Sequence, residues 1–270
     1  MNGVKGGEYK LYHRVWVSDD FSIEQQLEEA NVRKLLAKGG GYAVRNVFDF
    51  DRVSSSEFWY IVKDSFGGME ELSAKTRNQV RRCFRECDIR MVTIEEIKKS
   101  GYTIYKAAHK GYKVKSAVLS QKDYEEGLSS ISDRQEFWGA FDKQTGIMIA
   151  YAQNIITGEV CNYSVLKAIP DFQKRCYPYY GLIYEMNRHY LVDRGYRFVS
   201  DGARTMTNHS NVQQFLVEKF AFRKAYCHMK MYYKWWLRLV VKLIYPFRRC
   251  IRVAAVNTLL RMEEVSRSMK

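Results

Sequence analysis

The chain has 270 residues, of which 46% are hydrophobic and only 3 are proline. This composition is typical of a folded globular protein and excludes a long disordered or collagen-like chain. Lys and Arg number 44 against 30 Asp and Glu, a formal net charge of +14. Such an excess favours anionic partners, namely nucleic acid, an acidic membrane surface or a phosphorylated ligand, although a merely basic globular protein is the alternative. Met1 to Lys10 lacks an apolar segment, so we expect no signal peptide and a cytoplasmic location.

The cysteines show no metal-binding spacing. None of the six lies in a CxxC pair, and no His cluster accompanies them. We therefore expect reduced thiols, mostly buried, and no structural metal site. The six positions are Cys83, Cys87, Cys161, Cys176, Cys227 and Cys250.

The first 57 residues are predicted to extend the main sheet. Tyr9 to Val17 alternates like an edge strand, and Phe21 to Leu36 has the apolar spacing of a helix that Gly39 to Gly41 would end. Strands are predicted over 42–48 and 58–62. A separate N-terminal domain that gates the substrate is the alternative.

A basic helix is predicted from Leu72 to Cys87. It carries five cations within three turns, and their mutual repulsion suggests an anionic partner, while a solvated helix face is the simpler interpretation. A strand over 89–94 and helices over 95–112 and 121–131 follow. Tyr and His side chains, including His109, share one face of the first of these helices; they line either an acceptor pocket or the core. A hairpin is predicted over 136–141 and 147–156.

The segment 160–233 has the pattern of a mixed α/β unit. A strand over 160–166 leads into a loop with Pro170 and Pro178, and a helix over 179–191 would stop at Gly195. A strand over 196–200, a loop over 201–204, a helix over 208–219 and a long alternating run over 222–233 complete it.

This segment resembles the acyl-CoA-binding half of the GNAT (GCN5-related N-acetyltransferase) superfamily. In particular it resembles the FemAB-like branch, which includes the Fem-type aminoacyltransferases of peptidoglycan synthesis. The resemblance rests on the run Ser164 to Leu166, the basic loop before Gly181, the run Asn211 to Phe222 and the basic helix 72–82. It covers residues 58–233 and implies a mixed, mostly antiparallel sheet flanked by helices. Residues 1–57 would then be an extension and 234–270 a basic amphipathic tail.

The resemblance implies an acyl-CoA co-substrate, with aminoacyl-tRNA as the alternative donor. In this superfamily the pantetheine arm lies where the fourth strand splays from the fifth, and the next loop and helix N-terminus bind the pyrophosphate. The matching strand positions are Asn162, Ser164 and Leu166. The matching loop and helix positions are Arg175, Tyr179, Tyr180, Gly181 and Leu182. The loop departs from the family pattern because it has one glycine and added bulk, and Val217 stands near the position of the usual general acid.

The resemblance also implies a direct transfer, in which an amine or hydroxyl attacks a thioester or ester carbonyl. Candidate bases are Asp201 at a strand end, Glu185 and His109, although each also has an ordinary structural interpretation. Arg204 is a candidate phosphate or acceptor contact. Asn208 and Asn211 are candidates to orient the bound substrates, and Asn211 is also a candidate helix cap. No metal is implied.

The tail from Lys234 to Tyr245 has the pattern of an interfacial helix. Lys234, Arg238 and Lys242 form one stripe, and Trp and aliphatic residues fill the other side. The segment is too short and too charged to span a bilayer, and Arg248, Arg249 and Arg252 extend its positive charge. We expect 234–252 to contact an anionic membrane surface; a helix packed on the domain or a dimer contact is the alternative.

Together these patterns predict a cytoplasmic acyltransferase, peripheral on the inner membrane face. Its acceptor would be a small molecule or a lipid-linked precursor of the cell envelope or of a polysaccharide. The alternative is a non-catalytic module on a degenerate GNAT scaffold that binds a membrane surface or nucleic acid, with tRNA among the partners to consider. A dedicated RNA-binding protein fits less well, because no aromatic strand of the RNP type is interleaved with the basic residues.

Overall fold

A computed structural model of the chain describes residues 9–23, 27–111, 117–129, 133–206 and 211–268. The chain forms two compact units. Unit 1 contains residues 1–60, 203–208 and 224–270, and unit 2 contains residues 61–202 and 209–223. The chain therefore leaves unit 1 inside strand β4 (Phe58–Lys63) and returns to it twice. The division at residues 57 and 233 made from the sequence stays a prediction about domains.

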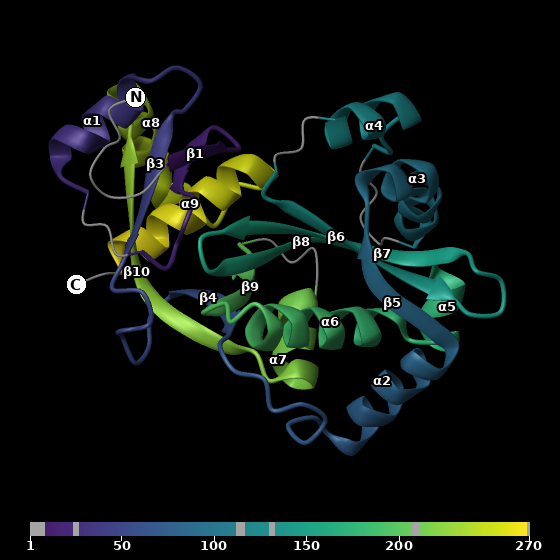
Figure 1. Cartoon of the computed structure of the whole chain (residues 1–270). Coiled ribbons are helices and arrows are strands. Elements are labelled where there is room, and N and C mark those ends of the chain that lie inside the picture. The colour runs from purple at the N-terminus through teal and green to yellow at the C-terminus, as the bar shows by residue number, and fades with distance from the viewer. Residues whose placement is uncertain (1–8, 24–26, 112–116, 130–132, 207–210, 269–270) are drawn as a thin grey trace. The chain divides into compact units, whose positions relative to one another are not determined.

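Unit 1 is built on paired strands in the order β1-β2-β3-β10, of which β1, β3 and β10 are labelled in Figure 1. The pairs β1–β2 and β3–β10 are antiparallel, and β2–β3 is parallel. Its elements are β1 (Tyr9–Tyr12), β2 (Val15–Ser18), α1 (Glu29–Ala37), β3 (Ala43–Phe48), β10 (Arg223–Tyr233), α8 (Trp235–Ile244), a short 3₁₀ turn (Tyr245–Phe247) and α9 (Ala254–Arg267). Helix α1 buries Val32 and Leu35 against Val44 of β3. These contacts form the core on that side of the strands.

Two predictions for unit 1 need correction, and one helix was missed. The single strand expected over 9–17 is a hairpin, because His13 and Arg14 both adopt positive φ, at 46° and 66°, and turn the chain between β1 and β2. The helix expected from Phe21 is shorter, since α1 begins at Glu29. Helix α9 was not predicted; its apolar positions are sparse, and Leu260 and Val265 are the residues that it buries.

In the described part of unit 2 the strands lie in the order β5-β6-β7-β8-β9, and the last residues of β4 follow next to β9. From β5 to β9 all neighbours are antiparallel except β8 and β9, which are parallel. The elements are α2 (Ala74–Glu86), β5 (Cys87–Val92), α3 (Ile94–Lys110), α4 (Gln121–Ser129), β6 (Gln135–Asp142), β7 (Met148–Thr157), β8 (Val160–Ala168), α5 (Pro170–Arg175), α6 (Pro178–Arg188), a π turn (His189–Asp193), β9 (Phe198–Ala203) and α7 (Val212–Phe220). The prediction of a mixed, mostly antiparallel α/β fold with a C-terminal amphipathic helix is confirmed.

Helices cover both faces of the strands in unit 2 (Figure 1). Successive side chains of a strand point to opposite faces. Phe137 of β6 packs in the cluster formed by Ile97 and Ile104 of α3. Its neighbour Trp138 reaches the other face, where its indole N–H donates to the Tyr190 hydroxyl at 3.0 Å. Helices α3 and α6 therefore lie on opposite faces and enclose the sheet between two apolar layers.

The loop and helix after β8 differ in detail from the prediction. Pro170 is the first residue of the short helix α5, where its missing N–H costs nothing because that position has no helical partner. Helix α6 begins at Pro178 for the same reason. It runs into the π turn, and Gly195, with φ of 63°, follows the end of this segment as predicted.

Candidate functional site

Strands β8 and β9 separate part of the way along their length. Their parallel pairing covers only Val160 to Asn162 of β8 and Phe198 to Ser200 of β9. Strand β8 continues to Ala168 with β7 as its partner on one side. Among the described strands, none pairs with the other side of β8 after Asn162. On that side residues 163–166 pair with no described strand, an arrangement in which an extended ligand can add to the strand. We call these residues, together with Asp201 and Gly202 of β9, the β8–β9 fork.

A β-bulge lies at the beginning of the fork. In the β7–β8 register Gln153 faces Val165, whereas the next residue, Asn154, faces Tyr163. Ser164 is therefore left without a partner in β7, and its side chain is exposed. Bulges bend a strand and redirect its side chains. The predicted donor-contact residues Ser164 and Leu166 lie in the fork, and Asn162 is the last residue of β8 paired with β9.

Asp201 lies at the point where the two strands part. It follows Ser200, which forms the last pair with β8. The Ser200 hydroxyl accepts from the Gly202 N–H at 2.9 Å and donates to the Ile61 carbonyl at 2.9 Å, so this end of β9 is held in place. Burial raises the pKa of Asp201 to about 7, and hydrogen bonding from Gln213 opposes the rise. A carboxyl group with this pKa takes up and releases protons near neutral pH, as a general base must.

Two further polar residues of the site were not predicted from the sequence. The Tyr163 hydroxyl donates to Asn187 Oδ1 at 2.7 Å. Burial raises the pKa of Tyr163 well above its ordinary value, and the charge of Asp201 contributes to the rise. Asn187 is 1% exposed, and its Nδ2 has no hydrogen-bond partner in the described part of the chain. A buried donor without a partner is costly, so this amide is available to a bound group.

Both residues left a signal in the sequence. Tyr163 is the one aromatic residue in the strand run 160–166, and Asn187 follows Leu182, Ile183 and Met186 on a helix face that is buried. A polar side chain at a position that the pattern predicts to be buried is a stronger indication of a functional site than the helix or strand that carries it. Their pairing across β8 and α6 required the register of the fold and could not be predicted from the sequence.

Arg175 and Gly181, two predicted pyrophosphate contacts, have structural partners. The Arg175 guanidinium forms an ion pair with Asp142, whose side chain is 2% exposed. It also lies 4.3 Å from the centre of the Phe172 ring. A Cβ at Gly181 would lie 2.4 Å from Cys83 Sγ, so glycine at this position allows α6 to approach α2 closely. Their predicted contact with a pyrophosphate is not tested by these observations.

The neighbouring α6 residues are also packed into the fold. Leu182 is fully buried. The Tyr180 ring packs edge-on against Phe215 of α7, with centroids 5.1 Å apart. Tyr179 is half-buried and accepts from the Gln173 amide at 3.4 Å. The prediction that these three residues contact a donor stays a prediction.

The other two candidate bases are engaged elsewhere. Arg188 donates to the Glu185 carboxylate on α6, with Nε at 3.1 Å from Oε1. His109 is 8% exposed at the end of α3, and its ring is tilted against Tyr105 at 6.0 Å. Asp201 is therefore the candidate base that the fold places at the fork, whereas the roles proposed for Glu185 and His109 remain predictions.

The remaining predicted contacts are distributed over both units. Arg204 belongs to unit 1, where Nη1 donates to Glu57 Oε2 at 2.9 Å. Asn211 precedes α7, but its side chain makes no capping hydrogen bond; instead its carbonyl accepts from the Phe215 N–H at 2.9 Å. Asn208 lies outside the described residues. Within the described part of the chain, no three His, Cys, Asp or Glu side chains are grouped so that they could hold a metal ion.

Comparison with known proteins shows the fold. No family model matches the sequence, and no curated protein matches it. The crystal structure of FemX is similar over 73% of this chain and 73% of its own, with a TM-score of 0.55 and 10% identity. L-PGS from Bacillus licheniformis covers 96% of this chain and 85% of its own at a TM-score of 0.47 and 11% identity. The ribosomal-protein-S18-alanine N-acetyltransferase of Escherichia coli is similar over 41% of this chain and 62% of its own, with a TM-score of 0.32 and 18% identity.

The fold assignment rests on FemX, because the other two TM-scores are below 0.5. An identity of 10% supports a likeness of fold and nothing finer. The chain resembles FemAB-like acyltransferases of the GNAT superfamily, and the resemblance is confirmed at the level of the fold.

Proposed function

We propose that the chain is an acyltransferase that works at the β8–β9 fork. It moves an acyl or aminoacyl group from an activated donor to an amine or hydroxyl acceptor. The observation that carries the proposal is the carboxyl group of Asp201, whose pKa is about 7, at the point where two parallel strands part. The likeness to FemX supports the fold on which this chemistry is placed.

The reaction needs no covalent enzyme intermediate. The acceptor nitrogen or oxygen attacks the donor carbonyl and forms a tetrahedral oxyanion. When that intermediate collapses, the bond from carbon to the leaving sulfur or oxygen breaks, and an amide or ester forms. The acceptor loses one proton to Asp201, and one proton from solvent or Asp201 neutralises the leaving thiolate or alkoxide. Atoms and charges therefore balance without an oxidant, reductant or metal.

The fork supplies the positioning that such a transfer requires. The backbone groups of residues 163–166, which pair with no described strand on the β9 side, hold an extended donor arm as a neighbouring strand would. The orphaned Nδ2 of Asn187 and the Tyr163 hydroxyl are the buried polar groups next to this strand. We assign Asn187 Nδ2 to the developing oxyanion, where a donor fixed in a dry site is most effective, and the Tyr163 hydroxyl holds the amide in place through Asn187 Oδ1.

The surroundings of α6 favour the ester of an aminoacyl-tRNA over a CoA thioester as donor. Helix α5 occupies the loop that would wrap a pyrophosphate, and Arg175 is paired with Asp142. The exposed Lys75 and Arg81 on α2 offer additional charge to a nucleic acid. A lipid-linked or soluble precursor of the cell envelope or of a polysaccharide is the acceptor class that the resemblance suggests.

Donor binding and turnover are tested separately. Purified protein is titrated with acetyl-CoA, with CoA and with aminoacylated tRNA while thermal stability is followed. A donor at a hundred times its dissociation constant should add about 2.7 kcal/mol to the free energy of unfolding. Transfer to hydroxylamine, a general amine acceptor, is then measured for the wild type and Asp201→Asn.

We expect Asp201→Asn to bind the donor normally and to lose about 10²-fold to 10⁴-fold in kcat. The control Asp88→Asn removes a carboxylate of β5 whose side chain is 67% exposed, and it should keep full activity. Stabilisation by no donor would contradict the proposal and support the non-catalytic scaffold. Donor binding with equal turnover in Asp201→Asn would exclude Asp201 as the base.

A further inference from the structure

Helix α8 presents an apolar stripe to solvent instead of to the core. Trp235, Leu239, Leu243 and Phe247 are 76%, 54%, 72% and 63% exposed. Their spacing of four residues places them along one side of the segment. The side packed on unit 1 is marked by Val241, which is 1% exposed. Monomeric globular proteins rarely expose a continuous apolar stripe without a partner for it.

A row of cations runs beside this stripe. Lys234, Arg238 and Lys242 repeat at the same spacing of four, one position before Trp235, Leu239 and Leu243. Arg249 and Arg252, both exposed, follow them. No Asp or Glu occurs from residue 234 to residue 262. Arg248 pairs with Glu264, but the segment itself combines exposed apolar side chains with an excess of positive charge.

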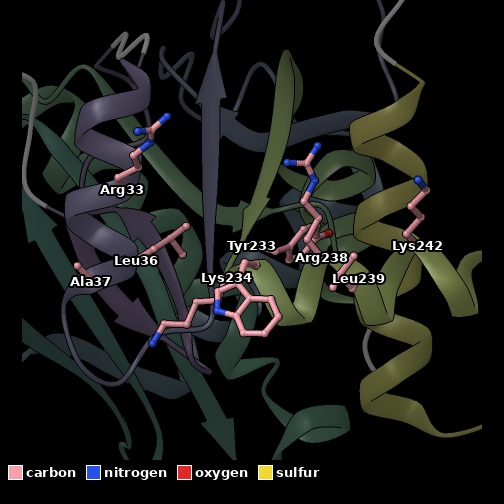
Figure 2. Close-up of a pocket in the computed structure, with 9 residues that line it drawn as sticks. Arg33, Leu36, Ala37, Tyr233, Lys234, Arg238, Leu239 and Lys242 are labelled. Atoms are coloured by element: carbon pink, nitrogen blue, oxygen red, sulfur yellow. The ribbon is translucent and has the colours of Figure 1, made fainter.

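The same cations line a cavity between α1 and α8, within unit 1. Figure 2 shows Arg33, Leu36 and Ala37 of α1 facing Arg238 and other residues of the α8 segment. The cavity has a volume of about 750 Å³, and its lining contains four cations and no acidic residue. Arg33 pairs with Glu29 at 2.9 Å, but both side chains are more than three-quarters exposed, so this ion pair is weak and easily exchanged. The lining residues are Arg33, Leu36, Ala37, Tyr233, Lys234, Trp235, Arg238, Leu239 and Lys242.

We propose that this surface docks on an anionic phospholipid bilayer. We call it the α8 surface: the apolar stripe, the three cations of α8 and the cavity with Arg33. The stripe enters the boundary between headgroups and acyl chains, and the cavity receives a lipid phosphate. Within the described residues no helix has both the length and the apolarity needed to cross a membrane. The exposed apolar stripe runs along the helix, so we place α8 parallel to the bilayer surface. The proposal is independent of the chemistry at the fork.

The combination of features selects a lipid surface over other partners. A nucleic acid would use the cations but would leave Leu239 and Leu243 exposed to water. A second copy of the chain would bring two surfaces of the same positive sign together, which is unfavourable. An anionic bilayer offers phosphate groups to the cations and an apolar boundary to the stripe at the same time.

The test uses the full chain and two kinds of vesicle. One kind is phosphatidylcholine alone, and the other is an equimolar mixture of phosphatidylcholine and phosphatidylglycerol. We expect sedimentation with the mixed vesicles and little with the neutral ones. Each cation near an anionic surface contributes about fivefold to partitioning, so Arg238→Glu/Lys242→Glu should lose about 25-fold or more. Leu239→Glu/Leu243→Glu should lose at least about tenfold.

Two matched controls show whether the loss of binding is specific to the α8 surface. They change charge or exposed apolar side chains elsewhere on the chain. Lys75→Glu/Arg81→Glu makes the same charge change on exposed positions of α2. Ile147→Glu/Val192→Glu places charges at positions of unit 2 that are 59% and 57% exposed. Both should sediment like the wild type. Circular dichroism checks that each variant folds.

Three results would overturn the proposal. The first is no sedimentation with the mixed vesicles. The second is equal binding by the α8 variants and the wild type, or an equal loss in the α2 control. The third is a wild-type dimer in analytical ultracentrifugation that Leu239→Glu/Leu243→Glu converts to a monomer, because the stripe would then be a contact between copies.

Discussion

Replacing Gly181 by Ala tests whether this glycine is required for packing. The added Cβ would lie 2.4 Å from Cys83 Sγ, 3.2 Å from Cys83 Cβ and 3.3 Å from Ile89 Cδ1. Cys83 is fully buried on α2, so its sulfur has no solvent-filled space into which it can turn. Forcing a methyl group into a packed core typically costs about 1–3 kcal/mol.

The expected net effect of Gly181→Ala is a loss of about 1–2 kcal/mol in the free energy of unfolding. The clash is offset by up to about 1 kcal/mol, because Ala is a better helix former than Gly. Gly127, on the exposed face of α4, is the matched control, since a Cβ there meets no atom within 4 Å. Gly127→Ala should therefore raise the free energy of unfolding by about 0.5–1 kcal/mol.

Urea denaturation of four proteins completes the measurement: wild type, Gly181→Ala, Cys83→Ala and the double variant. Removing the sulfur should restore part of the loss, with a coupling energy of about 1 kcal/mol between the two sites. The reasoning is refuted if Gly181→Ala is as stable as the wild type, or if the effects of the two substitutions simply add. If Gly181→Ala is as stable as the wild type but loses donor binding, the result would support the predicted ligand contact of Gly181.

Three other predictions concern buried groups. Because the pKa of Asp201 is about 7 in the folded chain and near 3.8 when exposed, the folded state holds an extra proton between these values. The free energy of unfolding should thus fall by up to about 4 kcal/mol between pH 4 and pH 7, and this part of the pH dependence should be absent in Asp201→Asn denaturation curves. Tyr190→Phe should lower the free energy of unfolding, measured by urea denaturation, by about 2–3 kcal/mol. Trp138 Nε1 and Asn154 Nδ2 donate to the Tyr190 hydroxyl at 3.0 and 3.2 Å and would lose their acceptor. An unchanged free energy of unfolding would contradict this prediction. A thiol reagent should modify one cysteine, Cys250, in the native chain, and rapid modification of a second would contradict the burial of the other five.

The regular elements were predictable where one pattern dominated. Apolar spacing located α6, and Gly195 located the end of the helical segment. Alternation located β7 and β10. Prediction failed where a local backbone conformation decides the structure: the positive φ of His13 and Arg14 breaks the first strand, although neither residue type demands that conformation.

Asp201 at a strand end was predictable as a candidate for the site, but its environment was not. Its pKa depends on burial, which is set by the tertiary packing around β9. The Tyr163–Asn187 pair joins residues 24 positions apart in sequence, on a strand and a helix. Conversely, the positive charge of α2 is partly neutralised locally, because Arg82 pairs with Glu86 at 3.1 Å. A count of cations overstates the repulsion on that helix.

For the α8 segment the pattern was predictable from the sequence, but the direction in which its apolar side faces was not. Its amphipathic pattern was evident, but the pattern alone does not say whether the apolar side faces the core. The exposure of Trp235 and Leu243, with Val241 buried on the other side, answers that question for unit 1. The cavity beside α8 depends on α1, which is about 200 residues away in the sequence.

Hydrogen exchange on the donor-bound protein tests the central claim most directly. Peptides that cover residues 163–168 of β8 and Asp201 of β9 are followed by mass spectrometry, with and without acetyl-CoA or aminoacylated tRNA. One of these donors should slow exchange at the fork, because it supplies partners for the backbone groups of residues 163–166, which pair with no described strand on the β9 side. Unchanged exchange at the fork with both donors, or protection confined to other segments, would contradict the proposal that the β8–β9 fork is the transferase site.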